Sequence, residues 1–237
     1  MNASKTQCMF IGTSQYLNMI PSNIKIKCGS EEIISSNQVK NLGLYMDKHM
    51  TFNVHIDEIS RKVSGILMYL NRIKDNFEDS TRVMIIQSLV LSVINYGIKL
   101  WGATNDLYLN KAQKLMNFAA RVAVVGVRKH DHISPTLQQL QWLKIKDKYT
   151  YEVCLFAFKV LEKEYPNWLY EFPNVGSLRD TSTRQNSNLQ VMRSRTELGS
   201  RSMLIRSPCI WNRLPKCVKD CSSTTIFKKK LKEHFLK

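Results

Sequence analysis

The spacing of apolar residues changes near residue 50 of this 237-residue chain. In the segment Ile24–Cys28, apolar and polar residues alternate, which is typical of a half-buried β-strand. Beyond His49, apolar residues recur every three or four positions, the spacing of one face of an α-helix. A chain that changes period in this way is neither one sheet nor one helical bundle throughout. We therefore expect an α+β fold, mainly α, in which a small β element precedes the helices.

The first fifty residues contain short strand-like segments rather than helical ones. Lys5–Ile11 and Val39–Met46 are further strand candidates, and Ile33–Ile34 is expected to return beside the strand at Ile24–Cys28. Gly43 interrupts its strand, and a missing side chain there permits a bulge or a close approach of another backbone. So few short strands cannot bury both faces of a sheet. The sequence therefore predicts a small, incomplete antiparallel β element, the edge of a sheet whose centre is missing.

Three helices are expected between residues 51 and 130, of which the second is apolar nearly all round in its middle. Apolar side chains form one stripe from Phe52 to Ile73, which predicts the first helix. Ser80 is a candidate N-cap of the second helix, and Thr104 or Asn105 of the third. Because the connections are short, we expect the three helices to pack as antiparallel neighbours in a bundle.

Further helices are expected after residue 130, where Ser134-Pro135 is typical of a helix start. Between residues 174 and 200 the composition shifts to Ser, Thr, Asn, Gln and Arg, which bury too little apolar surface to offset the entropy lost on ordering. We therefore divide the chain into a β element over 1–50, a helical bundle over 51–130, further helices over 131–173, a polar and mobile linker over 174–200, and a basic C-terminal segment over 201–237.

The chain is strongly basic, with 35 Lys and Arg against 19 Asp and Glu, a formal net charge of +16. Such a charge favours a polyanionic partner, and it favours nucleic acid more than an anionic membrane. The strongest local signal is a cluster of lysines on a helix expected near the C-terminus: Lys228, Lys229, Lys230 and Lys232. A nuclear-entry signal and the polar face of a membrane-surface helix are the alternative interpretations of this cluster.

Cysteine usage and hydropathy predict an intracellular protein, nuclear or cytoplasmic and not secreted. Six cysteines are scattered with no Cys-x-x-Cys pair, and no signal-peptide pattern precedes them, so reduced thiols are expected. The longest uncharged stretch lies between Arg82 and Lys99 and is shorter than the roughly 20 residues that a membrane helix needs. We therefore expect no membrane partner.

Six blocks of the sequence, in this order, resemble the C-terminal part of reverse transcriptases from non-LTR (LINE-type, jockey-like) retrotransposons: Asn2–Thr6, Val39–Asp47, Thr51–Ile56, Asn95–Gly102, Trp211–Pro215 and Phe227–Leu231. The first is similar to the Asn-x-x-Lys-Thr block that follows the catalytic strands of the palm. The second is similar to the Tyr-Leu-Gly-x-x-Leu-Asp block that closes the palm, with Asn41 where Tyr is usual. The third and fourth are similar to the Thr-Phe-x-x-His-Ile and Tyr-Gly-x-x-x-Trp elements of the thumb.

This resemblance implies the end of the palm, the thumb and the post-thumb region of an RNA-directed DNA polymerase. The family joins nucleotides with two Mg²⁺ ions held by an early palm Asp and an adjacent Asp-Asp pair. This chain contains no Asp-Asp dipeptide, and its adjacent acidic pairs (Glu31-Glu32, Asp57-Glu58 and Glu78-Asp79) are not flanked by strands as a metal-bridging hairpin needs. We therefore expect no catalytic residue and no cofactor in this chain alone; Mg²⁺ would belong to the missing palm.

The resemblance also implies which residues contact nucleic acid. Lys5 corresponds to the family's lysine near the phosphates of the incoming nucleotide, and Gly43 to the turn of the primer grip. The family's first thumb helix tracks the template–primer duplex, and its basic residues in this chain are Arg61, Lys62, Arg72 and Lys74. Each of these roles has an alternative. Lys5 is then a solvated lysine, Gly43 a structural bulge, and the basic residues of the helix part of a solvated face. We expect no metal at His130-Asp131-His132 or at Cys217, Cys221 and His234, because both sets have too few ligands.

Three functions remain open on these grounds. The first is a module that grips RNA or an RNA–DNA duplex without catalysing, with the missing palm and fingers of the same polyprotein as a further partner. The second is a non-catalytic helical module that binds a partner protein. The third is a degenerate copy of the element without a selected function.

Overall fold

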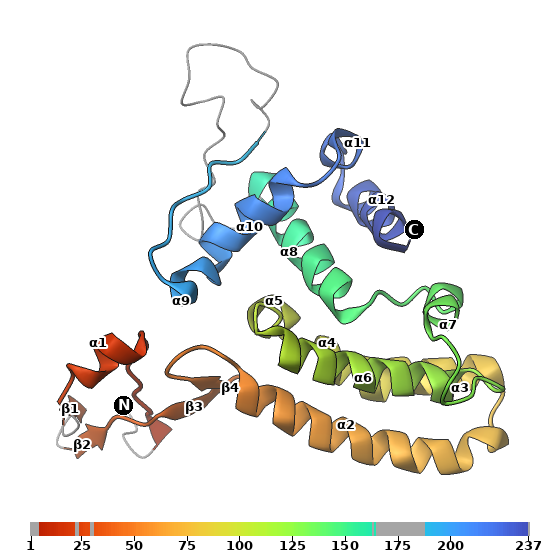
Figure 1. Cartoon of the computed structure of the whole chain (residues 1–237), viewed down its shortest axis with the longest axis horizontal. Helices are drawn as coiled ribbons and strands as arrows, with labels where there is room; N and C mark the ends of the chain where they lie inside the picture. The colour runs from red at the N-terminus through yellow and green to blue at the C-terminus, as the bar shows by residue number, and fades with distance from the viewer. Residues whose placement is uncertain (1–4, 22–23, 29–30, 163, 165–187, 237) are drawn as a thin grey trace.

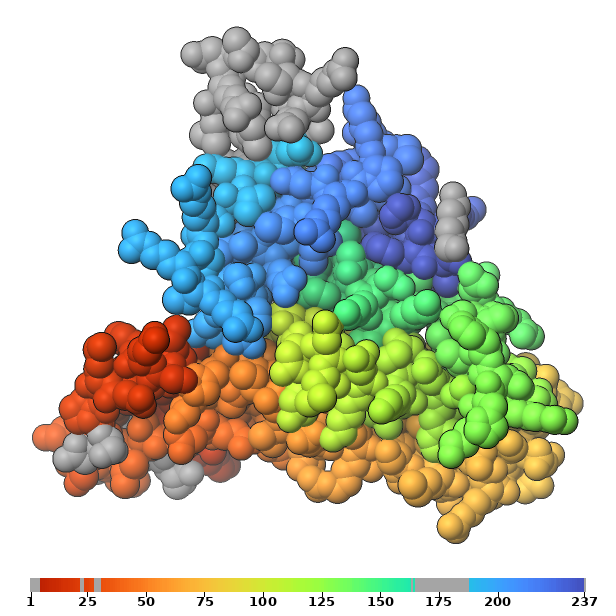
Figure 2. Space-filling model, viewed as in Figure 1, coloured from red at the N-terminus to blue at the C-terminus, as the bar shows by residue number. Residues whose placement is uncertain are grey.

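The computed structural model describes residues 5–21, 24–28, 31–162, 164 and 188–236, and they form a mainly helical structure with two small antiparallel sheets (Figure 1). The expectation of an α+β, mainly α fold is thereby confirmed. Figure 2 shows a triangular face, with the N-terminal elements at one lower corner and the C-terminal helices above them. None of the helices in these described ranges is both long enough and apolar enough to cross a bilayer.

Two separate hairpins make up the N-terminal β element. β1 (Lys25–Cys28) pairs with β2 (Glu31–Ile34), and β3 (Gln38–Asn41) pairs with β4 (Leu44–Asp47). The prediction of a strand over residues 5–11 is wrong: with the described part of the chain, this segment forms an isolated parallel bridge from Cys8 to Ser35 and no ladder, and a short helix, α1 (Ser14–Asn18), follows it.

The segment Val39–Met46 was expected to form one strand interrupted at Gly43. It is instead part of a hairpin that turns at Leu42 and Gly43. Both residues have positive φ, 46° and 84°, which matches a two-residue turn whose twist suits antiparallel strands. Glycine adopts such a φ freely, whereas a leucine rarely does. The turn was not predicted because Asn or Asp, not Leu, normally signals its first position.

The helical bundle contains α2 (Asn53–Ile73), a 3₁₀ turn (Lys74–Asn76), α3 (Asp79–Ile86), a π-helical turn (Gln87–Leu91), α4 (Ser92–Asn95), α5 (Ile98–Trp101) and α6 (Asp106–Ala123). The predicted apolar stripe of α2 is buried at Ile56, Ile59, Val63, Leu67 and Leu70. Asn105 caps α6 as expected, accepting a hydrogen bond from the backbone N–H of Tyr108 at 3.2 Å. Glu78, not Ser80, occupies the N-cap position of α3.

A buried arginine ties the turn between α2 and α3 to the far end of α6. The Arg82 guanidinium donates to the carbonyls of Lys74 at 2.9 Å, Phe77 at 2.7 Å and Ala123 at 3.3 Å. It also pairs with Asp79. A buried charge needs such partners, so we assign Arg82 a structural role in the bundle.

The remaining helices are α7 (Ser134–Gln139), α8 (Ile145–Leu161), α9 (Glu197–Ser200), α10 (Met203–Asn212), α11 (Lys216–Lys219) and α12 (Thr224–Leu236). Helices α10 and α12 pack on α8, whereas α7 packs on α6. Phe158 of α8 stacks on Phe227 of α12 with ring centroids 4.2 Å apart, and Trp211 of α10 lies 5.9 Å from Phe227.

The two hydrophobic cores divide within α8. Tyr149 and Val153 belong to the bundle core, whereas Cys154 and Phe158 belong to the core formed with α10 and α12. The predicted linker over 174–200 lies partly outside the described residues. In its described part, from residue 188, Leu189 is buried, and its backbone exchanges two hydrogen bonds with the Asn212 side chain at 2.8 and 2.9 Å. Residues 190–197 are exposed.

Candidate nucleic-acid interface

An ordered junction, Asp47–Phe52, fixes the hairpin β3–β4 relative to α2. The Asp47 carboxylate accepts hydrogen bonds from the backbone N–H groups of Thr51 at 2.9 Å and Phe52 at 2.8 Å. It also accepts from the Thr51 hydroxyl at 2.9 Å and from the His49 N–H at 3.0 Å. These charge-assisted bonds hold Met50 and Phe52 in left-handed conformations, with φ of 50° and 58°. The direction in which α2 leaves the hairpin is therefore set by one carboxylate.

Three distant parts of the chain attach to the same junction. The backbone N–H of Gly12 donates to the Lys48 carbonyl at 3.0 Å, and the Thr104 hydroxyl donates to the Thr51 carbonyl at 2.7 Å. The Arg201 guanidinium donates to two junction carbonyls at 3.0 and 3.3 Å. The N-terminal segment, the bundle and the C-terminal helices thus meet at these six residues.

The tip of the hairpin β3–β4 packs against the end of α4. The Tyr96 hydroxyl donates to the Leu42 carbonyl at 2.5 Å, and the Trp101 indole N–H donates to the Tyr96 carbonyl at 2.9 Å. Between them, Gly97 has a φ of +64°, and a Cβ built on it would lie 2.7 Å from Leu44 Cδ2. A residue without a side chain is therefore required where Leu44 packs.

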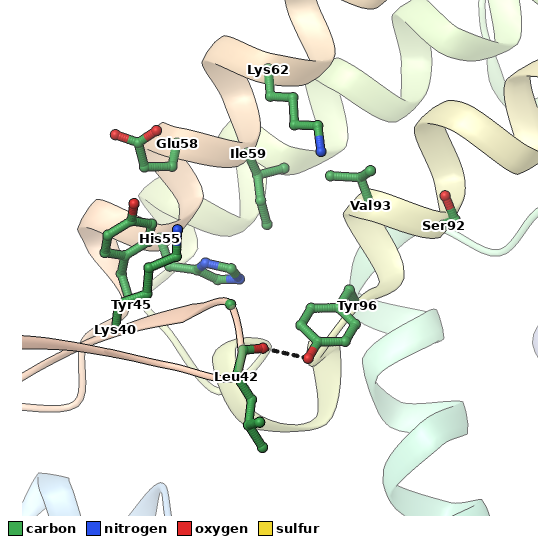
Figure 3. A pocket seen from close by; sticks show the side chains of 11 residues that line it. Lys40, Leu42, Tyr45, His55, Glu58, Ile59, Lys62, Ser92, Val93 and Tyr96 are labelled. Carbon is green, nitrogen blue, oxygen red and sulfur yellow. Dashed lines mark hydrogen bonds between the residues drawn. The ribbon is translucent and has the colours of Figure 1, made fainter. Parts of the chain in front are cut away.

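A cavity of about 530 Å³, the hairpin-tip pocket, lies between the hairpin, α2 and α4 (Figure 3). Its lining comes from all three elements: Lys40, Leu42, Gly43, Tyr45, His55, Glu58, Ile59, Lys62, Ser92, Val93 and Tyr96. It carries two lysines and two tyrosines, so an anionic group and an apolar ring both find matching partners there. The Lys40 ammonium lies 4.8 Å from the centroid of the Tyr45 ring.

His55 lies at the centre of this pocket, with its ring directed toward Tyr96 in Figure 3. The residue is only 4% exposed, and neither ring nitrogen has a hydrogen-bond partner among the residues that the structure describes. Burial lowers the pKa of His55 below 6.5, because desolvation penalises the charged imidazolium. At neutral pH the pocket therefore contains a neutral imidazole that can accept one hydrogen bond and donate another.

The structure brings Gly43 and Lys62 together at the hairpin-tip pocket and places the other α2 residues along one exposed face. Arg61, Gly65, Tyr69 and Arg72 are spaced three or four positions apart, so they share that face. Arg61 forms an exposed ion pair with Glu58, and a Cβ on Gly65 would meet nothing within 4 Å. The face is open to a large partner.

The remaining predicted residues lie elsewhere. Lys5 is exposed in the N-terminal segment, which Figure 1 shows at the opposite end of the molecule from the C-terminal end of α2. Lys74 lies in the 3₁₀ turn after α2, with its side chain half-buried. These two lysines therefore do not share a site with each other.

The four C-terminal lysines do not form one patch. Successive positions on α12 are rotated by about 100°, and Phe227 and Leu231 occupy the buried side. The Lys230 ammonium donates to the Cys217 carbonyl at 3.3 Å, and the Lys232 ammonium donates to the Gln141 side chain at 3.3 Å. The lysines therefore extend from different sides of α12: Lys228, Lys229 and Lys230 are exposed, and Lys232, one turn after Lys228, is half-buried.

A two-magnesium centre does not fit the described residues. No three His, Cys, Asp or Glu side chains gather within those ranges. Each adjacent acidic pair has at least one member in an ion pair: Glu32 with Lys25, Asp57 with Lys111 and Glu58 with Arg61, and Asp79 with Arg82. His130, Asp131 and His132 lie in an exposed turn before α7, not on a strand, and the Asp131 carboxylate accepts from the Arg128 N–H at 2.7 Å.

Sequence reasoning did not single out four residues that shape this interface: Lys40, Asp47, His55 and Tyr96. All four belong to the blocks that carry the family resemblance, so the signal was present in the blocks themselves. Lys40 and Asp47 lie in the block Val39–Asp47, His55 in Thr51–Ile56 and Tyr96 in Asn95–Gly102.

Comparisons of the chain with models of protein families, with curated proteins and with solved structures found no match.

Proposed function

We propose that this chain is the end-of-palm, thumb and post-thumb part of a non-LTR reverse transcriptase, and that it grips an RNA template or an RNA–DNA duplex without catalysing. The grip would extend from the hairpin-tip pocket along the exposed face of α2. The two metal ions of such an enzyme would belong to a palm that lies outside this chain.

The observation that carries the proposal is the meeting of three sequence blocks around one pocket. Gly43, His55 and Tyr96 come from the blocks similar to the end of the palm, the start of the thumb and a later thumb helix, and all three line the hairpin-tip pocket. The first and the last of these residues are 53 positions apart, so segments distant in the chain resemble one family in sequence and also adjoin each other in space. A chance resemblance of separate short blocks gives no reason for them to adjoin.

The exposed face of α2 supports the same proposal through its charge. Arg61, Lys62 and Arg72 lie along a helix of 21 residues, about 30 Å long. Contacts to phosphates need positive charge on one face and no particular base sequence. The surface ion pair of Arg61 with Glu58 contributes little to stability, so a phosphate can displace the carboxylate.

Salt-dependent binding tests this proposal. Affinity for a fluorescently labelled RNA–DNA hybrid is measured by anisotropy from low to physiological salt, for the natural chain and for the combined variant Arg61→Gln, Lys62→Gln, Arg72→Gln. We expect the slope of log K against log salt to become shallower by about 2 to 3, because each phosphate contact contributes about 0.9.

A charge-matched control separates position from total charge. Lys27→Gln, Lys129→Gln and Lys216→Gln remove three charges from exposed lysines away from the hairpin-tip pocket and α2. We expect this variant to keep the natural slope. Equal loss in both variants, or tight binding that does not depend on salt, would overturn the proposed grip. Primer extension by the purified chain, abolished by chelating magnesium, would overturn the proposed lack of catalysis.

A second, compatible proposal concerns the missing palm. The N-terminal element exposes large apolar side chains: Ile11, Tyr16, Met19, Ile26, Ile34 and Leu42. Hairpins of two strands are marginally stable alone and gain stability by pairing with further strands. We infer that preceding residues of the same polyprotein cover these hairpins.

Translation of the genomic DNA upstream of Met1 tests this inference. An in-frame segment containing an Asp-Asp hairpin is expected, and its co-expression should slow amide hydrogen exchange in β1–β4. Exchange that stays unchanged on co-expression would contradict it.

A further inference from the structure

A second cavity, the inter-core pocket, lies where the two hydrophobic cores meet. It has a volume of about 550 Å³ and is bounded by the helix α3–α4, the connection between α7 and α8, α8 itself and α12. The polar and aromatic residues that matter here are Asn95, Gln141, Trp142, Lys148, Tyr151 and Lys232. It is separate from the hairpin-tip pocket, with Ser92 of α4 the one residue that lines both.

Two polar groups at this pocket lack partners. Trp142 is 6% exposed, and its indole N–H has no hydrogen-bond acceptor among the residues that the structure describes. The buried side-chain oxygen of Asn95 also has no partner within those ranges. Buried polar groups in folded proteins are nearly always satisfied by protein, by ordered water or by a ligand, so these two groups are open to a ligand that carries both a donor and an acceptor.

The backbone at the pocket is irregular on two sides. The helix α3–α4 contains the π-helical turn Gln87–Leu91, whose closing N–H, that of Ser92, donates to the Gln87 carbonyl. Gln141 has a φ of +54°, a conformation that a glutamine rarely adopts. Such features occur preferentially at functional sites, because the surrounding fold must maintain them at a cost in stability.

The pocket is cationic and contains an aromatic ring. The Lys232 ammonium lies at its edge, 3.3 Å from the Gln141 side-chain oxygen. The Lys148 ammonium lies 5.0 Å from the centroid of the Tyr151 ring and 2.7 Å from a Glu152 oxygen. With Glu152 balancing Lys148, Lys232 supplies the net positive charge. An anionic group near Lys232 and a flat ring near Tyr151 both fit these surroundings.

We propose that the inter-core pocket binds one nucleotide, with its phosphate at Lys232, its base near Tyr151, and the polar edge of the base at Trp142 and Asn95. A base edge presents a donor and an acceptor side by side, which is the complement of the two open groups. The proposal rests on the proposed function, because the natural source of the nucleotide would be an unpaired position in the gripped RNA. A free nucleoside monophosphate has the same chemistry, and the experiment separates the two sources.

Isothermal titration calorimetry with the full chain tests the pocket directly. The probes are the four nucleoside 5′-monophosphates, the four nucleosides and inorganic phosphate. We expect at least one monophosphate to bind with a Kd below about 1 mM, and the nucleosides and phosphate to bind at least about tenfold more weakly, because each lacks one half of the recognition.

Three variants locate the binding. Lys232→Gln should weaken binding of the monophosphate about tenfold, the usual effect of losing a charge-assisted hydrogen bond. Trp142→Phe keeps a ring and removes the indole N–H, so it should weaken the binding of the nucleotide more than the binding of inorganic phosphate. Lys229→Gln changes an exposed lysine of the same helix outside the pocket and should leave binding unchanged. Binding that all three variants leave equal would overturn the proposal, as would binding to none of the monophosphates.

A second arm identifies the source of the nucleotide. An RNA–DNA hybrid with a single unpaired ribonucleotide is compared with a fully paired hybrid, each with the natural chain and with Lys232→Gln. Stronger binding of the unpaired hybrid, lost in Lys232→Gln, supports recognition within a strand. Equal binding of both hybrids, with monophosphate binding that Lys232→Gln weakens, supports a free nucleotide.

The two proposals can therefore fail separately. If the chain binds the hybrid through α2 but binds no monophosphate, the proposed nucleotide site is refuted and the proposed grip on the hybrid stands. If the chain binds a monophosphate, Lys232→Gln weakens that binding and no hybrid binds, the proposed grip is refuted and a site for the free nucleotide stands.

Discussion

At the scale of single residues, two glycines of the bundle have opposite roles. Gly97 adopts a left-handed conformation in contact with Leu44, whereas Gly65 lies on the open face of the regular helix α2. The same substitution should therefore change stability in opposite directions at the two positions. The sequence alone does not distinguish them.

Gly97→Ala should lower the free energy of unfolding by about 1–3 kcal/mol, because a left-handed alanine costs about 1–2 kcal/mol and its methyl group would displace Leu44. Gly65→Ala is the matched control and should raise the free energy of unfolding by about 0.5–1 kcal/mol. Urea unfolding followed by circular dichroism measures both. This explanation would be contradicted if Gly65→Ala lowered the free energy of unfolding as much as Gly97→Ala does.

Buried His55 should make stability depend on pH. Its pKa is lowered by burial, so between that value and 6.5 the unfolded state binds more protons than the folded state. The contribution of His55 is therefore fully present above pH 6.5 and is lost as the pH falls through the folded-state pKa, with a slope of at most about 1.4 kcal/mol per pH unit. We expect His55→Leu to lose less stability than the natural chain between pH 7.5 and 5.5.

His132→Gln serves as the control for this measurement, because the His132 side chain is exposed in a turn. It should keep the pH dependence of the natural chain. The assignment to His55 fails if the leucine variant and the natural chain lose stability in parallel.

At the scale of elements, the hairpin β3–β4 and helix α2 act as one unit because Asp47 joins them. Two of the sequence blocks, one ending in Asp47 and one beginning at Thr51, are held together by hydrogen bonds to that carboxylate. The residues of these two blocks therefore stabilise the junction between the hairpin and α2, in addition to any contact that they make with nucleic acid.

Asp47→Ala should lower the free energy of unfolding by about 2–4 kcal/mol, because it removes the acceptor of four hydrogen bonds and leaves backbone donors unpaired. Asp47→Asn retains one acceptor oxygen, so its loss should be smaller. Chemical denaturation of the two variants gives the comparison. If alanine and asparagine are equally tolerated, the carboxylate does not organise the junction.

Regular periodicity and local caps were predictable from sequence, whereas features set by distant contacts were not. The stripe of α2 and the cap at Asn105 depend on neighbours within a few residues, and both were predicted. The turn at Leu42 depends on Tyr96, which lies 54 positions away and holds the Leu42 carbonyl. Leu189 is an isolated apolar residue in a polar stretch, and only its pairing with Asn212 shows that it belongs to a core.

At the scale of the whole molecule, α8 makes the two cores interdependent. Its first half is buried against the bundle, and its second half is buried against α10 and α12. Neither core can open fully without exposing part of this helix. We therefore expect the two cores to unfold together.

Thiol labelling measures this coupling. Cys154 is buried in the second core, and burial raises its thiol pKa to about 12, so it should react with an alkylating reagent only when that core opens. The exposed Cys217 should react at once and serves as the internal control. Mass spectrometry across a urea series should show labelling of Cys154 at the same midpoint as the loss of far-ultraviolet circular dichroism. A lower midpoint for Cys154 would mean that the cores unfold separately.

The π-helical turn at Gln87–Leu91 sets the phase of everything that follows it in the helix. A π-turn is one residue longer than the α-helical turn that it replaces. Five residues in one π-turn cover nearly the same rotation as four in an α-helix, so deleting one residue there would leave the following segment nearly in phase. If all the present residues instead formed a regular α-helix, the following segment would rotate by about 100° and move about 1.5 Å along the axis. Tyr96 and Gly97 would then point away from the hairpin. A substitution that converted the wide turn into a regular one would thus uncouple the hairpin from the bundle while leaving every contacting side chain in the sequence.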